Sequence, residues 1–86
     1  MHRYITFISV DGAEHSYSLP DLLWQHLETD ALMELGFTTE IVSLRGQDLG
    51  PLFQRVANRT ALEIIAVPQC HATGGPAVFE IDVRPL

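Results

Sequence analysis

The single cysteine of the chain is followed directly by a histidine, and this pair is the first place to look for chemistry. Cys70 and His71 supply a thiol and an imidazole. A nearby proton acceptor raises the ionised fraction of a thiol, and the thiolate is a strong nucleophile. Neighbouring side chains of an extended chain point to opposite faces, however, and no third residue is placed to orient the histidine. We therefore assign no catalytic residue.

The pair belongs to a glycine-containing segment, residues 69–76, which is longer than a minimal hairpin turn. Phosphate-binding glycine loops lead into a helix N-terminus, whereas this segment leads into a predicted strand. Loops held by a rigid scaffold often carry binding residues. We therefore expect a contact surface in this loop, formed by Cys70, His71, Thr73, Gly74 and Gly75.

A metal site is not predicted. Cys70 and His71 could supply two ligands, and other ligands could come from His2, His15 or His26. The spacings typical of metal sites, CxxC, HxxxH and HExxH, are absent from the sequence. We expect no metal and no cofactor.

Three further features could take part in binding. Glu80 and Asp82 are two residues apart on a predicted strand, so they share a face and could work as paired carboxylates beneath a pocket. Arg55 and Arg59 are spaced i, i+4 on a predicted helix and could hold one phosphate or carboxylate between them. Trp24 is the only tryptophan, and a partly exposed tryptophan is a common interface anchor.

The first half of the chain predicts strands and helices around these residues. Residues 3–10 are rich in β-branched and aromatic side chains, and the dipeptide Asp11-Gly12 predicts a hairpin turn that returns through residues 14–18. If that turn does not close, residues 14–18 form a loop. Ser18 and Pro20 then indicate the start of a helix. Its apolar face would consist of Leu19, Leu22, Leu23, His26 and Leu27.

A single helix from Leu19 to Leu35 would place Asp30 and Glu34 in its apolar stripe, where an unpaired charge is costly. We therefore expect a break at Thr29, which would cap a second short helix running to Leu35. Gly36 would end that helix in the left-handed conformation.

The second half has clearer patterns. Residues 38–44 predict a strand that ends at Arg45-Gly46, and residues 49–57 predict an amphipathic helix with Pro51 in its first turn and Asp48 or Gly50 as its cap. Residues 61–67 are apolar on nearly both faces, as in a central strand. Residues 78–83 alternate, with Phe79, Ile81 and Val83 predicted to point inward.

These elements predict one α+β domain over residues 1–86. Its fold would be a two-layer sandwich with a four- to five-stranded mixed or antiparallel sheet and two helical regions on one face, in the order ββαβαββ or βαβαββ. The second order resembles that of the sulfur-carrier fold, but the Cys-Pro-x-Pro motif of that family is absent, so no residue role is carried over.

Composition narrows the class of partner. The chain has 86 residues, 11 acidic and 5 basic, all of the basic ones arginine, for a formal net charge of −6. This charge repels nucleic acids and anionic membranes and favours basic partners.

The lone cysteine excludes an internal disulfide framework, and the N-terminal apolar stretch is too short to span a membrane, so we expect a cytoplasmic protein.

We therefore expect a small protein-binding module, an inhibitor, immunity-type or accessory factor, that docks on a larger basic protein. The expected contacts are the 69–76 loop, Glu80, Asp82 and Trp24. Two alternatives stay open. One is a small enzyme or a sulfur or metal carrier that uses Cys70 and His71, and the other is a homo-oligomeric structural or ligand-binding domain, in which two copies pair through an open sheet edge or through Trp24.

Overall fold

A computed structural model describes residues 3–60 and 63–86 of the chain. In these residues the elements follow one another as β1 (Tyr4–Ile8), β2 (Glu14–Ser18), the 3-10 turn η1 (Leu19–Asp21), β3 (Leu22–Thr29), β4 (Leu32–Phe37), β5 (Glu40–Gln47), α1 (Gly50–Ala57), β6 (Glu63–Ile65), the 3-10 turn η2 (Gln69–His71) and β7 (Ala77–Pro85).

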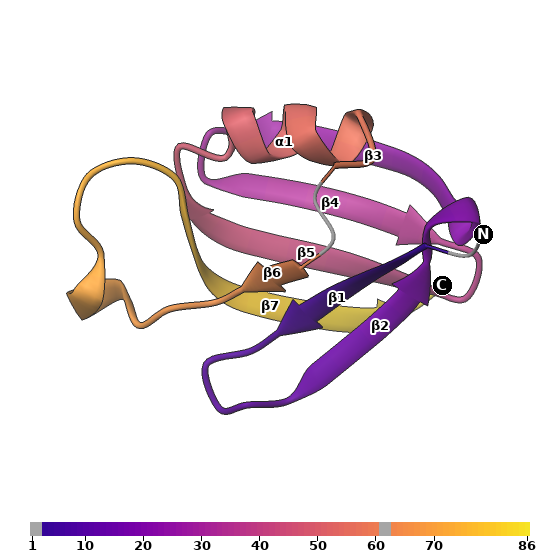
Figure 1. Ribbon diagram of the computed structural model, residues 1–86, viewed down its shortest axis with the longest axis horizontal. Helices are drawn as coiled ribbons and strands as arrows, with labels where there is room; N and C mark the ends of the chain where they lie inside the picture. Colours follow the sequence, from indigo (N-terminus) through magenta and orange to yellow (C-terminus); the bar gives the residue numbers. More distant parts are fainter. Residues whose placement is uncertain (1–2, 61–62) are drawn as a thin grey trace.

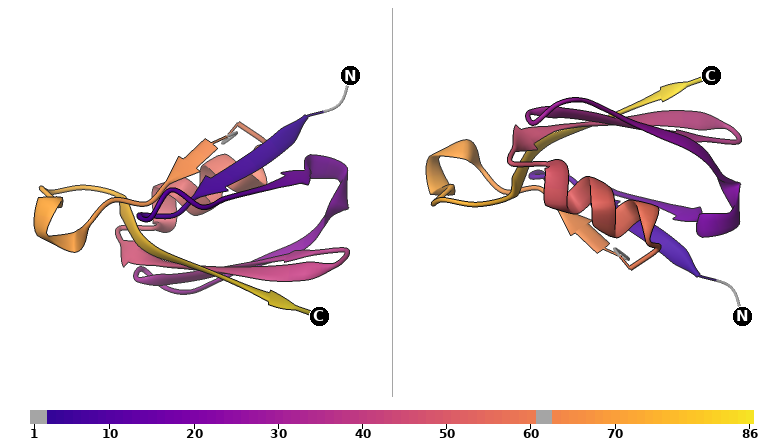
Figure 2. Two further views of the ribbon diagram at one scale, coloured as in Figure 1. Left: turned by 90° about the horizontal axis from the view of Figure 1, so that it is seen from below. Right: turned by 90° about the horizontal axis from the view of Figure 1, so that it is seen from above.

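The strands form two sheets that face each other. The smaller sheet has the order β2-β1-β6 and the larger one the order β3-β4-β5-β7. Helix α1 lies on the same side of the larger sheet as the smaller sheet does (Figure 1, Figure 2). The chain is thus a mostly-β protein of the α+β class with one helix in the described residues. The expectation of two helical regions on one face of a single sheet is wrong.

The predicted N-terminal hairpin is confirmed. Strands β1 and β2 pair antiparallel, and Gly12 at the turn has a φ of 92°, a conformation that glycine adopts without strain. The Asp11 carboxylate accepts a hydrogen bond from the Ala13 amide (3.0 Å), and the Gly12 amide donates to the Ser9 carbonyl (2.9 Å). The Asp11-Gly12 dipeptide therefore closes this turn through its local chemistry.

The two helices predicted between Leu19 and Leu35 are instead one turn of 3-10 helix followed by a β-hairpin. Pro20 lies in the 3-10 turn, as its fixed φ favours, but Ser18 makes no side-chain capping bond. Thr29, predicted to cap a helix, accepts a hydrogen bond from the Ala31 amide inside the turn that joins β3 to β4 (3.1 Å). Gly36, predicted to end a helix, lies within β4.

The reason for this error is visible in β4. Met33, Leu35 and Phe37 are almost completely buried, and the residues between them face the other side of the sheet, which is the period-2 pattern of a strand. The helical spacing of Leu22, Leu23 and Leu27 is coincidental, because Leu23 is 62% exposed at an irregularity in the pairing of β3 with β4.

The helix predicted over residues 49–57 is confirmed as α1, which begins at Gly50 and has Pro51 in its first turn. The residue at the N-cap position is Leu49, and it makes no side-chain capping bond, so neither Asp48 nor Gly50 is the cap. The preceding strand is also confirmed, but β5 continues through Arg45 and Gly46 to Gln47.

The strand predicted over residues 61–67 is shorter, and it is not central. In the described residues it is β6, which pairs only with β1, in parallel, at one edge of the smaller sheet. Ile65 is 53% exposed there. Ala61 and Leu62 lie outside the described residues.

The last strand is confirmed as β7, but one of its inward residues is different from the prediction. Arg45 pairs with Glu80 and Gly46 pairs with Val78, so Phe79 is an extra residue at a β-bulge. Because of this bulge, Val78 takes the buried position that strict alternation would give to Phe79. Ile81 and Val83 pack against the core as predicted.

The core fills the space between the two sheets and α1. Its aromatic centre is formed by Phe7, Tyr17 and Phe37, with Tyr17 stacked on Phe37 at a ring-centroid distance of 4.3 Å and Phe7 edge-on to both. None of the helices in the described residues has the length and apolar character needed to cross a bilayer.

Candidate functional site

One face of the larger sheet packs on the core, and no described element covers the other face (Figure 2). We call this second face the outer face. Side chains alternate along a strand, so the residues between the buried positions point to it. It is formed by Trp24 and His26 of β3, Leu32, Glu34 and Gly36 of β4, Ile41, Ser43 and Arg45 of β5, and Glu80, Asp82 and Arg84 of β7.

The centre of the outer face holds a charged network that joins three strands. The Arg84 guanidinium donates hydrogen bonds to the Glu34 carboxylate (Nη2 to Oε2, 2.6 Å) and to the Ser43 hydroxyl (Nη1 to Oγ, 2.7 Å). The Ser43 hydroxyl in turn donates to Glu34 (3.2 Å). Ser43 is 8% exposed, because these two long side chains lie over it. The network fixes the positions of β4, β5 and β7 side chains on an open surface.

The electrostatics of this network favour an ionised Glu34. The pKa of the Glu34 carboxyl is lowered, first by the hydrogen bond from Arg84, then by the bond from Ser43 and the charges of Arg84 and His26, while partial burial acts in the opposite direction. A carboxylate held in this state is a poor proton donor at neutral pH. Glu34 therefore carries its negative charge inside the network, where it pairs with Arg84.

Glu80 and Asp82 lie beside this network. Both are exposed and line an open hollow of about 300 Å³ whose wall also contains Leu32, Glu34, Ser43, Arg45 and Arg84. Glu80 is opposite Arg45 in the strand register, and Asp82 is opposite Ser43. The sequence placed these two carboxylates on one face, and the structure adds the hollow. Glu34, Ser43, Arg45 and Arg84 were missed.

Trp24 lies at one end of the same face. It is 42% exposed, and it lies in one row across the sheet with Gly36, Ile41 and Arg84, each of which pairs with the next. His26 was predicted on the apolar face of a helix. On β3 Trp24 and His26 are two positions apart and share the outer face instead, and His26 is exposed. The outer face is thus aromatic at one end and charged in the middle.

The 69–76 loop is at the other end of the sheet, where it projects beyond β5 and β7 (Figure 1). Cys70 is exposed in η2, and Thr73 and Gly74 are exposed. The Gln47 side-chain amide anchors the loop by donating to the carbonyls of Thr73 (3.2 Å) and Gly75 (2.8 Å). Gly75 has a φ of 89°. The side chain of His71 lies outside the described part of the structure.

This arrangement divides the predicted contact surface into two parts. Ile41, in the row of Trp24, and Gln47, which holds the loop, are six residues apart on β5. At roughly 3.3 Å per residue they are separated by about 20 Å. Trp24 and the loop tip formed by Cys70, Thr73, Gly74 and Gly75 are therefore at opposite ends of the sheet, and Glu80 and Asp82, opposite Arg45 and Ser43, lie between them on the outer face.

Two sets of residues that were considered as possible binding groups do not come together. Among the described residues, no group of three or more histidine, cysteine or acidic side chains could hold a metal ion. Arg55 and Arg59 do not converge, because α1 ends at Ala57 and Arg59 lies beyond it, beside a different pocket from the one that Arg55 lines. His2, named as a candidate ligand, lies outside the described residues.

Comparisons with protein-family models, with curated proteins and with solved structures give no match for this chain.

Proposed function

We propose that this chain is a protein-binding module that docks through the outer face of its larger sheet onto a basic protein surface. The observation that carries the proposal is the exposed indole of Trp24 on an uncovered sheet face that also presents Glu80 and Asp82. Partly exposed tryptophans are enriched among the residues that dominate binding energy at protein interfaces. Inhibitors, immunity-type factors and accessory subunits are the kinds of protein that work in this way.

The charge of the outer face supports a basic partner. Arg84 is paired with Glu34. Of the remaining charges that line the hollow, Glu80 and Asp82 outnumber Arg45, and the whole chain carries a formal charge of −6. A negative surface accelerates encounter with a positive one and penalises partners of like charge. For the same reason a second copy of this face and a nucleic acid are both disfavoured as partners.

The fixed positions of several side chains on the outer face support binding as well. The Arg84, Ser43 and Glu34 side chains are already hydrogen-bonded to one another, and Trp24 is held against the neighbouring strand at Gly36. A surface whose side chains are fixed before binding loses less conformational entropy when the complex forms. This feature suits a module that works by docking, and it requires no chemical step.

The alternative that uses Cys70 has less support. Cys70 is exposed on a short 3-10 turn, and no described group of histidine, cysteine and acidic residues surrounds it in the number that a metal site needs. A thiol mechanism also needs a base that a third group orients, and the sequence places no such group beside Cys70 and His71. We therefore give the protein-binding proposal precedence.

A paired capture and affinity experiment tests the proposal. The wild-type chain and three variants, Trp24→Ala, Asp82→Lys and Glu14→Lys, are each immobilised and incubated with native lysate. Each protein that the wild type retains is then purified, and its affinity for all four chains is measured. Glu14 is exposed on β2, in the other sheet, so Glu14→Lys changes the charge by the same amount away from the outer face.

The proposal predicts a partner whose affinity falls at least about tenfold with Trp24→Ala and with Asp82→Lys, which corresponds to about 1.4 kcal/mol. The affinity should change little with Glu14→Lys and should weaken as salt is added. A partner that binds all four chains equally, or the absence of any stoichiometric partner, would contradict docking through this face.

A further inference from the structure

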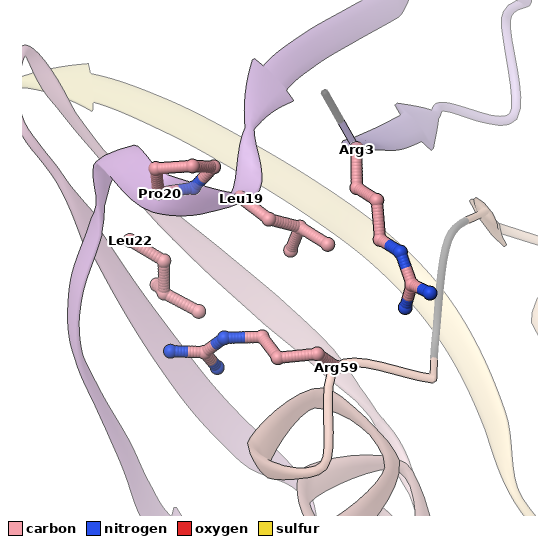
Figure 3. A pocket seen from close by; sticks show the side chains of 5 residues that line it. All are labelled: Arg3, Leu19, Pro20, Leu22 and Arg59. Carbon is pink, nitrogen blue, oxygen red and sulfur yellow. The ribbon is translucent and has the colours of Figure 1, made fainter. Parts of the chain in front are cut away.

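A pocket of about 310 Å³ lies away from the outer face, where the start of β1, the turn η1 and the exit of α1 meet. The described residues that line it are Arg3, Leu19, Pro20, Leu22 and Arg59. Figure 3 shows the Arg3 guanidinium on one side of the pocket and the Arg59 guanidinium on the other, with the side chain of Leu19 between them and that of Leu22 beside the Arg59 guanidinium. The pocket thus has a positive charge at each end and an apolar middle.

The apolar middle is part of the core boundary. Leu19 is 5% exposed and Leu22 is 7% exposed, so both are fixed by packing. The backbone of Arg3 is fixed as well, because its carbonyl accepts a hydrogen bond from the Leu19 amide (2.9 Å). The pocket floor is therefore formed before any ligand binds.

Arg59 is held by the end of the helix. The Arg59 amide donates to the Val56 carbonyl (3.0 Å) and the Thr60 amide to the Arg55 carbonyl (2.9 Å), which is the Schellman pattern of a helix C-terminus. Glycine is the usual residue at this left-handed position, yet here an arginine has a φ of 59°. Its guanidinium donates to the Val56 carbonyl (2.9 Å).

The charges at this pocket are unbalanced. Two of the five arginines of the chain gather there, although the chain has a formal charge of −6. No carboxylate is among the lining residues, and neither arginine makes an ion pair with a described residue. Two uncompensated guanidinium groups attract anions, because they offer charged donors in a geometry that matches carboxylate and phosphate oxygens.

We propose that this pocket binds a small organic dianion whose two anionic groups are joined by an apolar segment. A linear dicarboxylate is the simplest member of this class. One carboxylate would pair with Arg3 and the other with Arg59, while the methylene groups between them would contact Leu19 and Leu22. This site is independent of the outer face, so it stands or falls separately from protein docking.

Titrations followed by the backbone amide NMR signals of the ¹⁵N-labelled chain test this proposal. The ligands are adipate, with two carboxylates on a four-methylene chain, hexanoate, with one carboxylate on an apolar chain of similar length, and 1,6-hexanediol, with none. Inorganic phosphate tests for attraction of an anion without an apolar segment. The proposal predicts saturable shifts near Arg3, Leu19 and Arg59 with adipate, at least tenfold weaker binding of hexanoate and of phosphate, and no saturation with the diol.

Two variants and a control complete the test. Arg59→Gly removes one guanidinium but keeps a residue that favours the left-handed conformation, so it should fold at least as well as the wild type and bind adipate at least tenfold more weakly. Arg3→Gln should weaken binding to a similar extent. Arg55→Gln, on α1 beside another pocket, should bind like the wild type. Equal affinity for adipate and hexanoate, wild-type affinity of either pocket variant, or no saturable binding of adipate would overturn the proposal.

Discussion

The indole of Trp24 lies directly over Gly36 on the neighbouring strand, in the space where any other residue would carry its β-carbon. The two residues are partners in the register of β3 and β4, and a β-carbon built on Gly36 would overlap the indole ring of Trp24. A glycine in a strand exposes backbone, and an aromatic side chain from the adjacent strand can cover it. The glycine therefore fixes how the tryptophan is presented on the outer face.

We expect Gly36→Ala to displace the indole. The new methyl group cannot share its space with Trp24, so the ring must move or the strands must separate, and overpacking of this kind costs about 1–3 kcal/mol. Urea unfolding measures the loss, and the emission of Trp24, the only tryptophan, should shift to longer wavelength in the folded variant.

A double-mutant cycle and a control make this prediction specific. In a Trp24→Ala background, Gly36→Ala should cost much less, because the clash is gone. Gly50→Ala is the control, since the space around Gly50 is open and the residue begins α1, where alanine is a better helix former. A Gly36→Ala variant as stable as Gly50→Ala would show that the indole does not depend on the glycine.

Gly46→Ala should be more damaging than Gly36→Ala. A β-carbon on Gly46 would overlap the backbone carbonyl of Ala77, which cannot rotate away as a side chain can. This close approach of β5 and β7 occurs at the bulge that puts Val78 into the core and leaves Phe79 out of the ladder. We expect a loss at or above the upper end of the range of about 1–3 kcal/mol for overpacking.

The measurement is again urea unfolding, with Gly74→Ala as the matched control. Gly74 lies in the exposed 69–76 loop with open space around it. Its substitution should change the free energy of unfolding by no more than about 0.5 kcal/mol. If Gly46→Ala and Gly74→Ala are equally stable, β7 can pair with β5 without the close approach.

The fold could be predicted from the sequence where local signals decide the structure. Asp11-Gly12 closes the first hairpin through its own side-chain and backbone bonds, and the apolar spacing of residues 49–57 with Pro51 gives α1. The region from Leu22 to Phe37 could not be predicted in this way, because its leucines fit both a helical and a strand period. The choice is made by pairing with β5, which is a contact between distant segments that local spacing does not contain.

The same limit applies to the candidate site. Trp24, Glu80 and Asp82 could be selected by residue type and exposure, and all three lie on the outer face. The Arg84, Ser43 and Glu34 network could not, because its members come from three strands whose register is set by the fold. A break at Thr29 was expected because an unbroken helix would have placed Glu34 in an apolar stripe, whereas Glu34 lies on the open side of strand β4.

The lowered pKa of Glu34 predicts a loss of stability in acid. Glu34 binds a proton less readily in the folded state than at its ordinary pKa of 4.5, so the unfolded chain takes up more protons as the pH falls. The contribution of the ionised group is therefore complete above about pH 4.5, and it is lost as the pH falls through the lowered value. Because the Arg84 side chain is 46% exposed, we expect this pair to contribute no more than about 1 kcal/mol.

Glu34→Gln isolates this contribution from those of the other carboxyl groups. The difference in unfolding free energy between the wild type and Glu34→Gln should shrink as the pH is lowered from 6 to 3, and added salt should reduce it at pH 6. Glu80→Gln serves as the control on the same face, since Glu80 makes no ion pair with a described residue. A difference that is constant with pH would show that Arg84 does not stabilise the ionised carboxylate.

Tyr17 should limit stability at the alkaline end. Its hydroxyl donates a hydrogen bond to the Glu40 carboxylate (2.9 Å), and burial, this bond and the negative charge of Glu40 raise the pKa of Tyr17 to about 12. The folded pKa is above the ordinary value of 10.0, so the contribution of the protonated phenol is complete below pH 10 and is lost as the pH rises toward 12. Ionisation would also place a second negative charge against Glu40.

Absorbance of tyrosinate at 295 nm measures this pKa directly in a Tyr4→Phe background, where Tyr17 is the one tyrosine left. Glu40→Gln keeps an acceptor for the phenol but removes the charge, so it should move the titration to lower pH. Tyr17→Phe should abolish the part of the alkaline stability loss between pH 10 and 12 that belongs to this residue. If Tyr17 titrates near pH 10 while the chain is still folded, its hydroxyl is not held by Glu40, and the link between β2 and β5 through this pair is absent in solution.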